Sequence, residues 1–501
     1  APLPAAPGAD AHREAALRAD AQAGHPYPTG ERSRWLPARA RAVVDSLDPA
    51  KKARRGSPDF EGALPPEAAF CWTEADFLAF VQSSGYIRPK LKVRYYISPV
   101  CPATIVDLVS PVLSAQNWTC TVDASVAPAP PIFIWEGCRR SIDPRPTLAR
   151  GGLVNRVAPL FPATTKVGML RAVRAQCAAQ GVDFPPPWYP RAFSLPEDLE
   201  AWKAHAASRP DARWIYKPNG GARGIGLILV ASVADVDSPG RPFRDRCREL
   251  RPEAIEEDDP LAERFFAPRG IIQEYVRDLL LVGGRKFAVR AYVLVARVDP
   301  LLALLHPAAY AKVCGLEYDA ARFSQADLFR HVTNQEFQKM GSRAYEDWSV
   351  VPVMSLEEMD MRLSVEACGR SDGQEGGGCA QWSAGFWPQV RQICRDVVGC
   401  FRGACRERGR LGEFEILGLD FICDASGRAI FLEANRDPSW VVDGDTKRGI
   451  IPALVREMLD IVFAVHAGGP AEAAWRASLA GARGGAPRFE VLIDDAASPA
   501  A

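Results

Sequence analysis

Two apolar runs in the last part of the sequence carry side chains that could bind a cation. Asp420 lies in the run 415–423, and Glu433 and Asn435 lie in the run 429–435. An unpaired charge away from water costs several kcal/mol, so a carboxylate inside an apolar run needs a partner. Carboxylate and amide oxygens suit Mg²⁺, which proteins hold through one or two carboxylates together with substrate phosphates. The two acids could instead each pair with a separate arginine in a structural ion pair.

The two runs are expected to form a β-hairpin that brings these groups together. Both are short and rich in β-branched and aromatic residues, as strands are. A two-residue loop, Ser426-Gly427, would place Asp420 directly opposite Glu433. Asn435 follows two residues later and shares the face of Glu433, because side chains alternate along a strand. The sequence therefore predicts two acids and an amide on one face of a hairpin.

Residues 214–230, with the sequence WIYKPNGGARGIGLILV, read as a strand, a glycine-rich turn and a second strand. The glycines, Gly224 among them, let backbone N–H groups approach an anion, and Lys217 and Arg223 add positive charge. The pattern is neither the P-loop GxxxxGK[ST] nor a GxGxxG that opens a helix. The segment is therefore either an anion-binding loop or the plain loop of a β-hairpin.

Residues 285–298 give the longest strand signal in the chain, with a period of two. Lys286, Ala288, Arg290 and Tyr292 share one face, and the residues between them are apolar. Two cations on one face suit either a solvated sheet edge or a cleft in which they neutralise phosphates. The strand is too apolar for a fully solvated edge, which favours the cleft.

Two shorter segments could complete such a cleft. Gln273 and Tyr275 stand at the end of a predicted strand, which is either a surface connection or a hinge whose backbone holds an adenine ring with help from Gln273. The stretch HVTNQEFQK places Asn334 on a loop or at a helix start. A polar residue there is either a helix cap or a ligand-binding group.

Composition limits the classes of protein to consider. The 501 residues are 48% apolar and 24% charged, ordinary values for globular domains. Lys+Arg and Asp+Glu both number 61, so the charge balance gives no general case for nucleic acid or a membrane surface. No apolar run reaches the ~18 residues of a membrane span. The 13 cysteines are scattered without a CxxC pair, which indicates reduced thiols in the cytoplasm.

Mixed strand and helix patterns predict an α+β or mixed α/β fold. Residues 1–60, rich in Ala, Pro, Arg and Asp, are expected to be mostly disordered. The remaining chain is predicted to divide into an N-terminal α/β domain (61–165), a central subdomain with the glycine-rich loop (166–262), a C-terminal subdomain with the hairpin (263–466) and a loose Ala/Gly-rich tail (467–501). Exposed loops are expected at 251–260 and 369–380.

The order of these segments resembles the tubulin–tyrosine ligase-like family, whose catalytic core is an ATP-grasp fold. The resemblance spans about residues 153 to 460. The matching stretches are VNRVAPLFPATTKVGMLRAV, WIYKPNGGARGIG, IIQEYVRDLLLVGGRKFAVRAYVLV, HVTNQEFQK, FEILGLDFICD and FLEANRDPSW. The central and C-terminal subdomains would then be the two halves of the ATP-grasp core.

The resemblance implies a Mg-ATP-dependent ligase that joins an amino acid, glutamate being expected first, to a carboxylate of a tubulin tail. In this family ATP converts a carboxylate into an acyl phosphate, and the amine of the partner attacks it, releasing ADP and phosphate. The implied partners are tubulin tails or microtubules and a free amino acid, with no nucleic acid and no membrane. The resemblance also implies a monomer in the cytoplasm, the cytoskeleton, or a cilium or flagellum.

The resemblance further implies roles for particular residues. The metal ligands would be Asp420, Glu433 and Asn435. The nucleotide would be held by Lys166, Lys217, Arg223, Gly224, Gln273, Tyr275, Val276, Lys286 and Asn334. The catalytic residues would be Lys286, Arg290 and Glu433, with Arg290 facing the carboxylate that awaits activation.

The chain departs from the family pattern at two places. Ala288 stands between Lys286 and Arg290 where the family usually has an acid, and Tyr310 stands near the place of a family arginine that handles substrate carboxylates. Lys312 could replace that arginine only as a point charge. These departures leave a second hypothesis open, a catalytically silent relative that binds tubulin or nucleotide as a scaffold. A ligase for small molecules is a third option.

Overall fold

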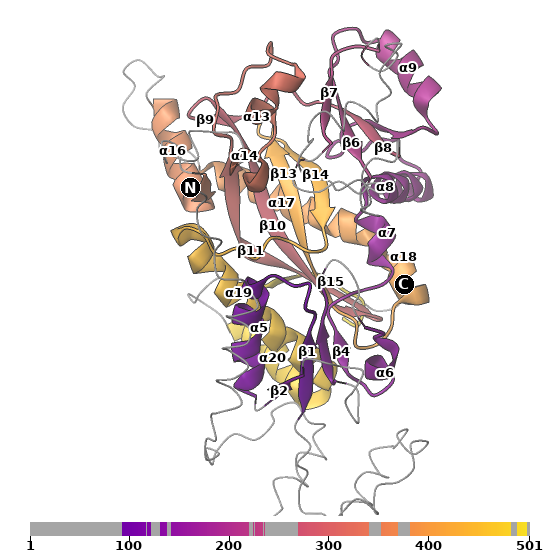
Figure 1. The fold of residues 1–501 in the computed structure, drawn as a ribbon, viewed down its shortest axis with the longest axis vertical. Helices are drawn as coiled ribbons and strands as arrows, with labels where there is room; N and C mark the ends of the chain where they lie inside the picture. The colour runs from indigo at the N-terminus through magenta and orange to yellow at the C-terminus, as the bar shows by residue number, and fades with distance from the viewer. Residues whose placement is uncertain are drawn as a thin grey trace, which may run out of the picture.

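The computed structural model describes residues 93–116, 118–121, 131–137, 142–219, 224, 226–233, 235, 269–339, 352–368, 381–481 and 488–497. The predictions for residues 1–60, for the loops at 251–260 and 369–380, and for Arg223 lie outside the described residues. Helices and strands are mixed along the chain, and the strands of the described residues form three sheets. The predicted mixed α/β architecture is therefore confirmed (Figure 1).

A small parallel sheet forms the first part of the described chain, within the predicted N-terminal domain. Its strand order is β2-β1-β3-β4, and its strands are short and mostly buried. The elements are β1 (Arg94–Ile97), α5 (Ala103–Ser114), β2 (Thr119–Cys120), β3 (Phe133–Trp135), α6 (Arg145–Leu148), β4 (Leu153–Val154) and α7 (Leu160–Ala163).

A four-stranded antiparallel sheet follows, in the order β5-β8-β6-β7. Its elements are α8 (Lys166–Gln180), β5 (Ala192–Leu195), α9 (Leu199–Ala207), β6 (Trp214–Pro218), β7 (Ile228–Val230) and β8 (Gly270–Glu274). The predicted domain boundary at residue 262 is wrong here, because β8 pairs with both β5 and β6 inside this sheet. Because β8 lies far from β5 and β6 in the sequence, only the observed strand pairing shows that it belongs to this sheet.

The large sheet has the strand order β12-β11-β10-β13-β14, with β15 pairing to β11 and β9 to β10. Its strands are β9 (Leu281–Val282), β10 (Arg285–Val298), β11 (Leu301–Val313), β12 (Val353–Ser355), β13 (Glu415–Cys423), β14 (Ala429–Asn435) and β15 (Glu490–Asp494). The helical segments in this part are η3 (Gln325–Asp327), α13 (Leu328–His331), α14 (Gln335–Lys339), α16 (Leu356–Cys368), α17 (Trp382–Gly399), α18 (Arg402–Arg408), α19 (Asp445–Ala467) and α20 (Gly469–Gly481).

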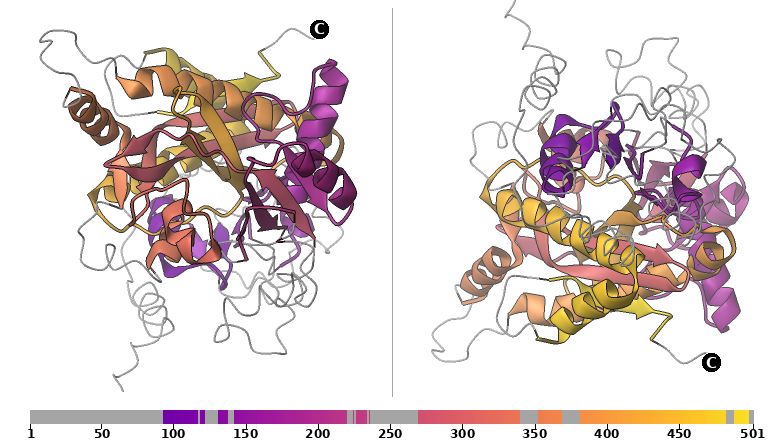
Figure 2. Two further views of the ribbon diagram at one scale, coloured as in Figure 1. Left: turned by 90° about the horizontal axis from the view of Figure 1, so that it is seen from above. Right: turned by 90° about the horizontal axis from the view of Figure 1, so that it is seen from below.

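Strand β10 has the predicted alternation, and it divides the core into two layers. Phe287 and Val289 face the cluster that includes residues of α8 and α17, whereas Tyr292 and Leu294 face the cluster that includes residues of α5 and α19. Seen end-on, helices cover both faces of the large sheet (Figure 2). Burial on both faces explains why the strand is so apolar outside its polar positions.

The segment after α19 is not the loose tail that we predicted from its Ala/Gly-rich composition. Residues 469–481 form α20, and residues 490–494 form β15, which pairs antiparallel with β11 from Leu302 to Leu305. Arg476 of α20 forms an ion pair with Asp494 of β15. Composition was misleading because alanine is also the best helix former.

The β13–β14 hairpin reaches its predicted pairing by a different route. Its loop has three residues rather than two: the backbone N–H of Asp424 donates to the carbonyl of Arg428 (3.0 Å), and Gly427 adopts the left-handed φ of +85° that such a turn requires. A one-residue bulge before Glu433 then shifts the register again. The two differences cancel, and the predicted pairing of Asp420 with Glu433 is confirmed.

A buried carboxylate joins the N-terminal part of the chain to the hairpin. Glu415 is fully buried and accepts from Arg436 through Nε (2.7 Å) and Nη2 (3.1 Å). It also accepts from the backbone N–H of Val157 (3.0 Å), and Arg156 Nη1 lies 3.5 Å from the same carboxylate. Because Arg436 directly follows Asn435, this ion-pair network holds the end of β14 in place.

Two further expectations concern the described residues. Eight cysteines of the described ranges, Cys314, Cys394, Cys400 and Cys423 among them, are free thiols, as predicted. No helix in the described ranges combines the length and the apolar character needed to cross a membrane.

Candidate active site

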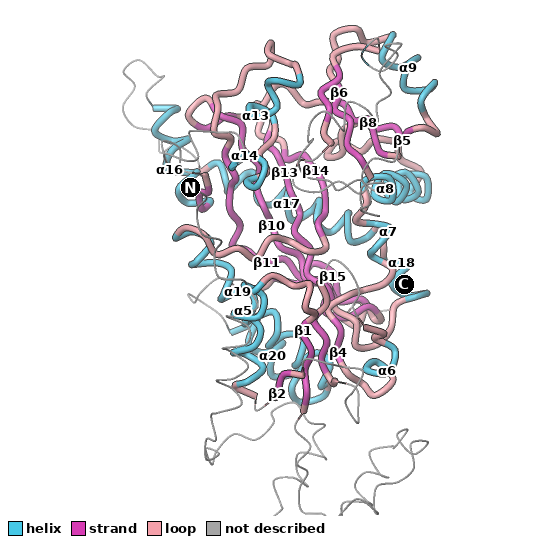
Figure 3. Tube along the Cα trace, viewed as in Figure 1, coloured by secondary structure: helices cyan, strands magenta, loops and turns pink. Residues whose placement is uncertain are grey.

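A cleft of about 950 Å³, counted with its open mouth, lies between the small antiparallel sheet and the large sheet. Figure 3 shows β6 and β8 of the small sheet beside the β13–β14 end of the large one. Most of the predicted site residues line this cleft, namely Lys166, Lys217, Gly224, Gln273, Tyr275, Val276, Lys286, Asn334, Asp420 and Glu433. Arg290 and Asn435 are not among the lining residues, although both contact Asp420.

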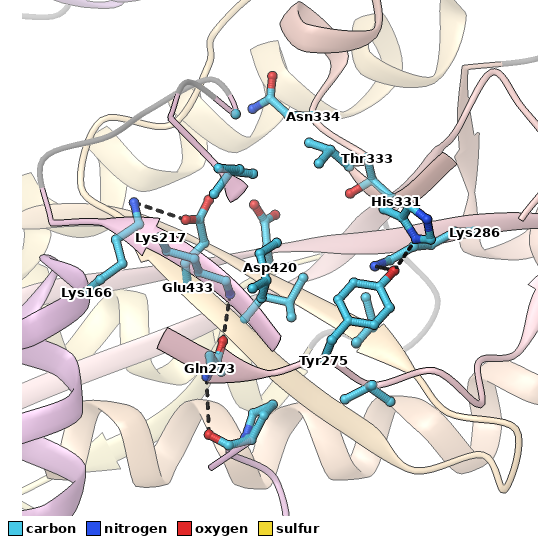
Figure 4. A pocket seen from close by; sticks show the side chains of 18 of the residues that line it. Lys166, Lys217, Gln273, Tyr275, Lys286, His331, Thr333, Asn334, Asp420 and Glu433 are labelled. Atoms are coloured by element: carbon cyan, nitrogen blue, oxygen red, sulfur yellow. Dashed lines mark hydrogen bonds and ion pairs between the residues drawn. The ribbon is translucent and has the colours of Figure 1, made fainter. Parts of the chain in front are cut away.

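The three predicted metal ligands converge on the hairpin wall of the cleft (Figure 4 shows the two acids). The amide nitrogen of Asn435 lies 3.5 Å from Asp420 Oδ2 and 3.3 Å from Glu433 Oε1. Rotation of this amide about its χ2 bond would present its oxygen in place of its nitrogen. The convergence that the alternation predicted is therefore present.

Asp420 is already surrounded by positive charge. It is buried and forms a bidentate ion pair with Arg290, with Nε–Oδ1 at 2.7 Å and Nη2–Oδ2 at 3.0 Å, and Lys312 Nζ lies 2.8 Å from Oδ1. The carboxyl pKa lies well below its usual range: burial alone would raise it, but the charge of Arg290 and then that of Lys312 outweigh burial. Arg290 thus faces Asp420 rather than open space in the cleft.

The donor set fits a hard divalent cation that completes its shell with phosphate oxygens. Across the described ranges no three His, Cys, Asp or Glu side chains form a metal site by themselves. Two carboxylates and an amide are too few to enclose a cation, but they match the partial protein shell that is usual for Mg²⁺ beside substrate phosphates. Asp420, Glu433 and Asn435 would hold the ion.

Two lysines face Glu433 from the other wall of the cleft. Lys166 at the start of α8 lies 3.2 Å from Glu433 Oε2, and Lys217 on β6 donates to Gln273 Oε1 at 2.7 Å. Burial lowers the pKa of Lys217 to about 8, although the charge of Glu433 opposes this shift. Gln273 also donates to the carbonyl of Pro190 (3.3 Å), so its side chain is fixed.

Lys286 of β10 is buried at the far end of the same cleft. Its ammonium donates to the hydroxyl of Tyr275 (2.9 Å) and lies 4.5 Å from the centre of that ring. Burial lowers the pKa of Lys286 to about 8. The backbone N–H of Tyr275 donates to the carbonyl of Arg213 (2.7 Å), so the hinge backbone that we expected to hold adenine is already paired at Tyr275.

Gly224 packs against α14, the helix that Asn334 precedes, and both residues line the cleft. Asn334 Oδ1 accepts from the backbone N–H of Phe337 (3.2 Å), which makes it the cap of α14 as well as a lining residue. Gly224 has a φ of +76°, and a Cβ there would lie 3.2 Å from the Phe337 side chain. A glycine is thus required where the loop packs against α14.

Sequence reasoning missed the apolar lining of the cleft. Ile215 and Leu227 line it from the small sheet, and Ile422 and Leu432 line it from the hairpin. Ile422 lies two residues after Asp420, so the alternation that we used for the acids would also have placed it on this face.

The two departures from the family pattern are both buried. Ala288 shares the face of Lys286 but does not line the cleft, because it packs under Leu279, Ile422 and Ile430. The alanine is fully buried, so it leaves no exposed gap in the cleft wall at this position.

Tyr310 is the second position at which the chain differs from the family pattern. It is paired with Arg290 across β10 and β11, and its hydroxyl lies 3.4 Å from that of Tyr292. The Lys447 ammonium lies 5.7 Å from the centre of the Tyr310 ring. Lys312, two residues later, supplies the cleft cation that the sequence suggested as a substitute.

A cleft between two antiparallel sheets that is lined by both lysines and carboxylates is suited to binding a phosphate-bearing ligand together with a cation. Comparison with known families identifies which class this chain belongs to. The model of the tubulin-tyrosine ligase family matches residues 161–469, more than half of the chain. The chain belongs to this family, and the predicted ATP-grasp type of fold is confirmed.

Curated relatives show the same affiliation. The human protein named inactive polyglycylase TTLL10 is 28% identical over 254 residues, which cover 50% of this chain and 34% of the human one. The mouse protein polyglycylase TTLL10 is 26% identical over 316 residues, covering 60% and 42%. A probable alpha-tubulin polyglutamylase of Tetrahymena thermophila is 23% identical over 278 residues, covering 55% and 60%. The matches span about a third to three fifths of these relatives' own lengths.

Proposed function

We propose that this chain is a Mg-ATP-dependent ligase that adds an amino acid, glutamate in the first instance, to carboxylates of tubulin tails. The observation that carries the proposal is the meeting of Asp420 and Glu433 with Lys217 and Lys286 in one cleft. Family membership and the names of the relatives, polyglycylases and polyglutamylases, support the same chemistry. The partners would be tubulin or microtubules and a free amino acid, in the cytoplasm at the cytoskeleton or in a cilium or flagellum.

Each wall of the cleft would have its own task. The apolar lining residues, Ile215 and Ile422 among them, would enclose the base, while Lys217 and Lys286 neutralise the phosphates. Asp420, Glu433 and Asn435 would hold Mg²⁺. When bound, ATP and Mg²⁺ would supply the phosphoryl group that activates a substrate carboxylate.

The charge around Asp420 supports an acidic substrate. One carboxylate, Asp420, is shared by two cations, Arg290 and Lys312, so the cluster carries an excess of one positive charge. A divalent cation that engages Asp420 would weaken its hold on both side chains. Arg290 or Lys312 could then pair with a carboxylate of the incoming amino acid or of the tail.

The direct test is amino-acid incorporation. Folded protein would be incubated with microtubules, ATP, Mg²⁺ and labelled glutamate, glycine or tyrosine in separate reactions. We expect incorporation of glutamate into tubulin, and none into tubulin whose acidic tails have been removed by protease. Incorporation of glycine alone would keep the ligase but correct the amino acid, whereas no incorporation of any of the three would defeat the enzymatic proposal.

One observation favours the silent scaffold as a second candidate. Asp420 is fully engaged by Arg290 and Lys312, so a metal ion would have to compete with two cations for it. A scaffold of this kind would bind nucleotide or tubulin without turnover. Nucleotide binding that is indifferent to Mg²⁺, together with the absence of incorporation, would select this candidate.

Nucleotide affinity should fall as pH rises through about 8. Lys217 and Lys286 each have a pKa of about 8 because both are buried. Only their protonated forms attract phosphate, so affinity is full below this pH and is lost above it. Titration calorimetry with ADP between pH 6.5 and 9.5 measures the effect, and adenosine, which lacks phosphates, serves as the control. An ADP affinity that stays constant across this range would exclude both lysines as phosphate contacts.

A further inference from the structure

A chain of hydrogen bonds fixes the ammonium of Lys286 in the cleft. It begins at the backbone carbonyl of Arg322, which can only accept, and which lies 2.7 Å from His331 Nε2. His331 therefore carries its proton on Nε2, and its Nδ1 accepts from the Tyr275 hydroxyl at 2.8 Å. The phenol oxygen in turn accepts from Lys286 at 2.9 Å. Figure 4 shows the Lys286, Tyr275 and His331 members of this chain side by side.

The direction of this chain follows from its fixed end. Because the carbonyl sets the tautomer of His331, the hydroxyl proton of Tyr275 must point toward Nδ1. A lone pair of the Tyr275 oxygen then points toward Lys286, which is buried and needs an acceptor. Burial lowers the pKa of His331 to about 4, so the ring stays neutral and keeps this arrangement at physiological pH.

The other groups around Lys286 do not replace the phenol. Among the described residues, the thiol of Cys314 and the ammonium of Lys217 act on it besides Tyr275 and His331. Tyr318 borders the Tyr275 phenol, but its own hydroxyl donates to the carbonyl of Arg277 (2.8 Å). Burial raises the pKa of Cys314 to about 12, so it stays uncharged, and Lys217 repels a second ammonium. Within the described part of the chain, the ring face of Tyr275 and its hydroxyl are thus the contacts that stabilise this buried charge.

We propose that Tyr275 and His331 are positioning residues that hold the Lys286 ammonium charged and aimed into the cleft, where it meets the phosphates of the ligand. Tyr275 thus contributes its side chain to phosphate binding, in addition to any contact of the hinge with the base. This inference rests on the proposed nucleotide site.

The first arm of the test uses the protein without any ligand. Competitive acetylation of Lys286 with acetic anhydride, followed by mass spectrometry across a pH series, reports the pKa of this amine. In Tyr275→Phe, which keeps the ring and removes the acceptor, the midpoint should fall by about one pH unit below the wild-type value. His331→Leu should shift it in the same direction, and His331→Gln, which can donate and accept at similar positions, should restore part of it.

The second arm measures affinity for ADP and for adenosine at pH 7.5. Tyr275→Phe should weaken ADP about tenfold and leave adenosine within about twofold. The double variant with His331→Leu should be no weaker than Tyr275→Phe alone, because both substitutions break one chain. Tyr95→Phe is the matched control: it removes a buried phenol hydroxyl from β1 of the small parallel sheet, is not among the residues that line the cleft, and should change neither affinity.

The two arms separate this inference from the proposed function. If wild-type protein binds no ADP but Tyr275→Phe shifts the Lys286 midpoint, the proposed function fails and the positioning role stands. If ADP binds and the midpoint is unchanged in both Tyr275→Phe and His331→Leu, the positioning role is wrong. Equal losses of ADP and adenosine affinity in Tyr275→Phe would show that Tyr275 contacts the base and does not act through the phosphates. Should Tyr275→Phe fail to fold, the His331 variants carry the test.

Discussion

Replacing Glu433 with glutamine is expected to lower kcat/KM for amino-acid incorporation by about 100-fold or more, because the side chain proposed to bind Mg²⁺ loses its negative charge. Glu433 lies between Lys166 and Asn435 and faces the cleft. Glutamine keeps the size of the side chain, so packing changes little. The expected loss of kcat/KM therefore comes from the missing negative charge and not from altered packing.

The measurement is a Mg²⁺ titration of both ATP binding and incorporation. In Glu433→Gln the concentration of Mg²⁺ that gives half of the maximal response should rise at least about tenfold, within the range seen when support of a metal ligand is lost. The control is Glu472→Gln, the same change in a partly buried acid of α20 that pairs with Arg297 and Arg476 away from the cleft. A Glu433→Gln protein with the Mg²⁺ response and turnover of the wild type would exclude the hairpin as the metal site.

Replacing Glu415 is expected to have the largest effect on stability. The carboxylate is fully buried and pairs with Arg436, and Arg156 lies close to it. Glu415→Gln leaves Arg436 without its countercharge and leaves Arg156 with its 3.5 Å pair to Asp437 alone, which should lower the free energy of unfolding by about 3–5 kcal/mol. Urea denaturation followed by tryptophan fluorescence measures the change.

Two further variants separate charge from packing at this position. In Glu415→Gln combined with Arg436→Gln one unpaired cation is removed, so part of the lost stability should return. Glu200→Gln is the exposed control: its pair with Lys203 lies on the surface, and its loss should cost about 0.5 kcal/mol or less. A Glu415→Gln protein as stable as the wild type would show that the network does not hold β14 to the N-terminal part of the chain.

The strand pattern of the cleft could be predicted because it depends on local chemistry. The alternation of β10 follows from its sequence, and so do the faces of Lys286 and Arg290. The pairing of Asp420 with Glu433 was also predicted, although the assumed turn was one residue too short. The bulge that compensated for the turn has no sequence signal that we recognise.

The remaining features depend on contacts between distant segments. Nothing in the sequence near Arg290 indicates that its guanidinium would bind Asp420, 130 residues away, because pairing in a sheet sets that contact. The same holds for β8, which inserts between β5 and β6. Glu415 begins an apolar run and resembles an edge residue until its partner Arg436 is placed beside it.

The pairing of β15 with β11 has a consequence for biosynthesis. Strand β11 ends at Val313, but the backbone of Leu302–Leu305 along its open edge meets its partner only when residues 490–494 have left the ribosome. At a synthesis rate of roughly 5–20 residues per second, this apolar strand edge would stay unpaired for on the order of ten seconds or more before β15 is made. During translation this unpaired edge could pair with other chains, and a chaperone that binds it would prevent this.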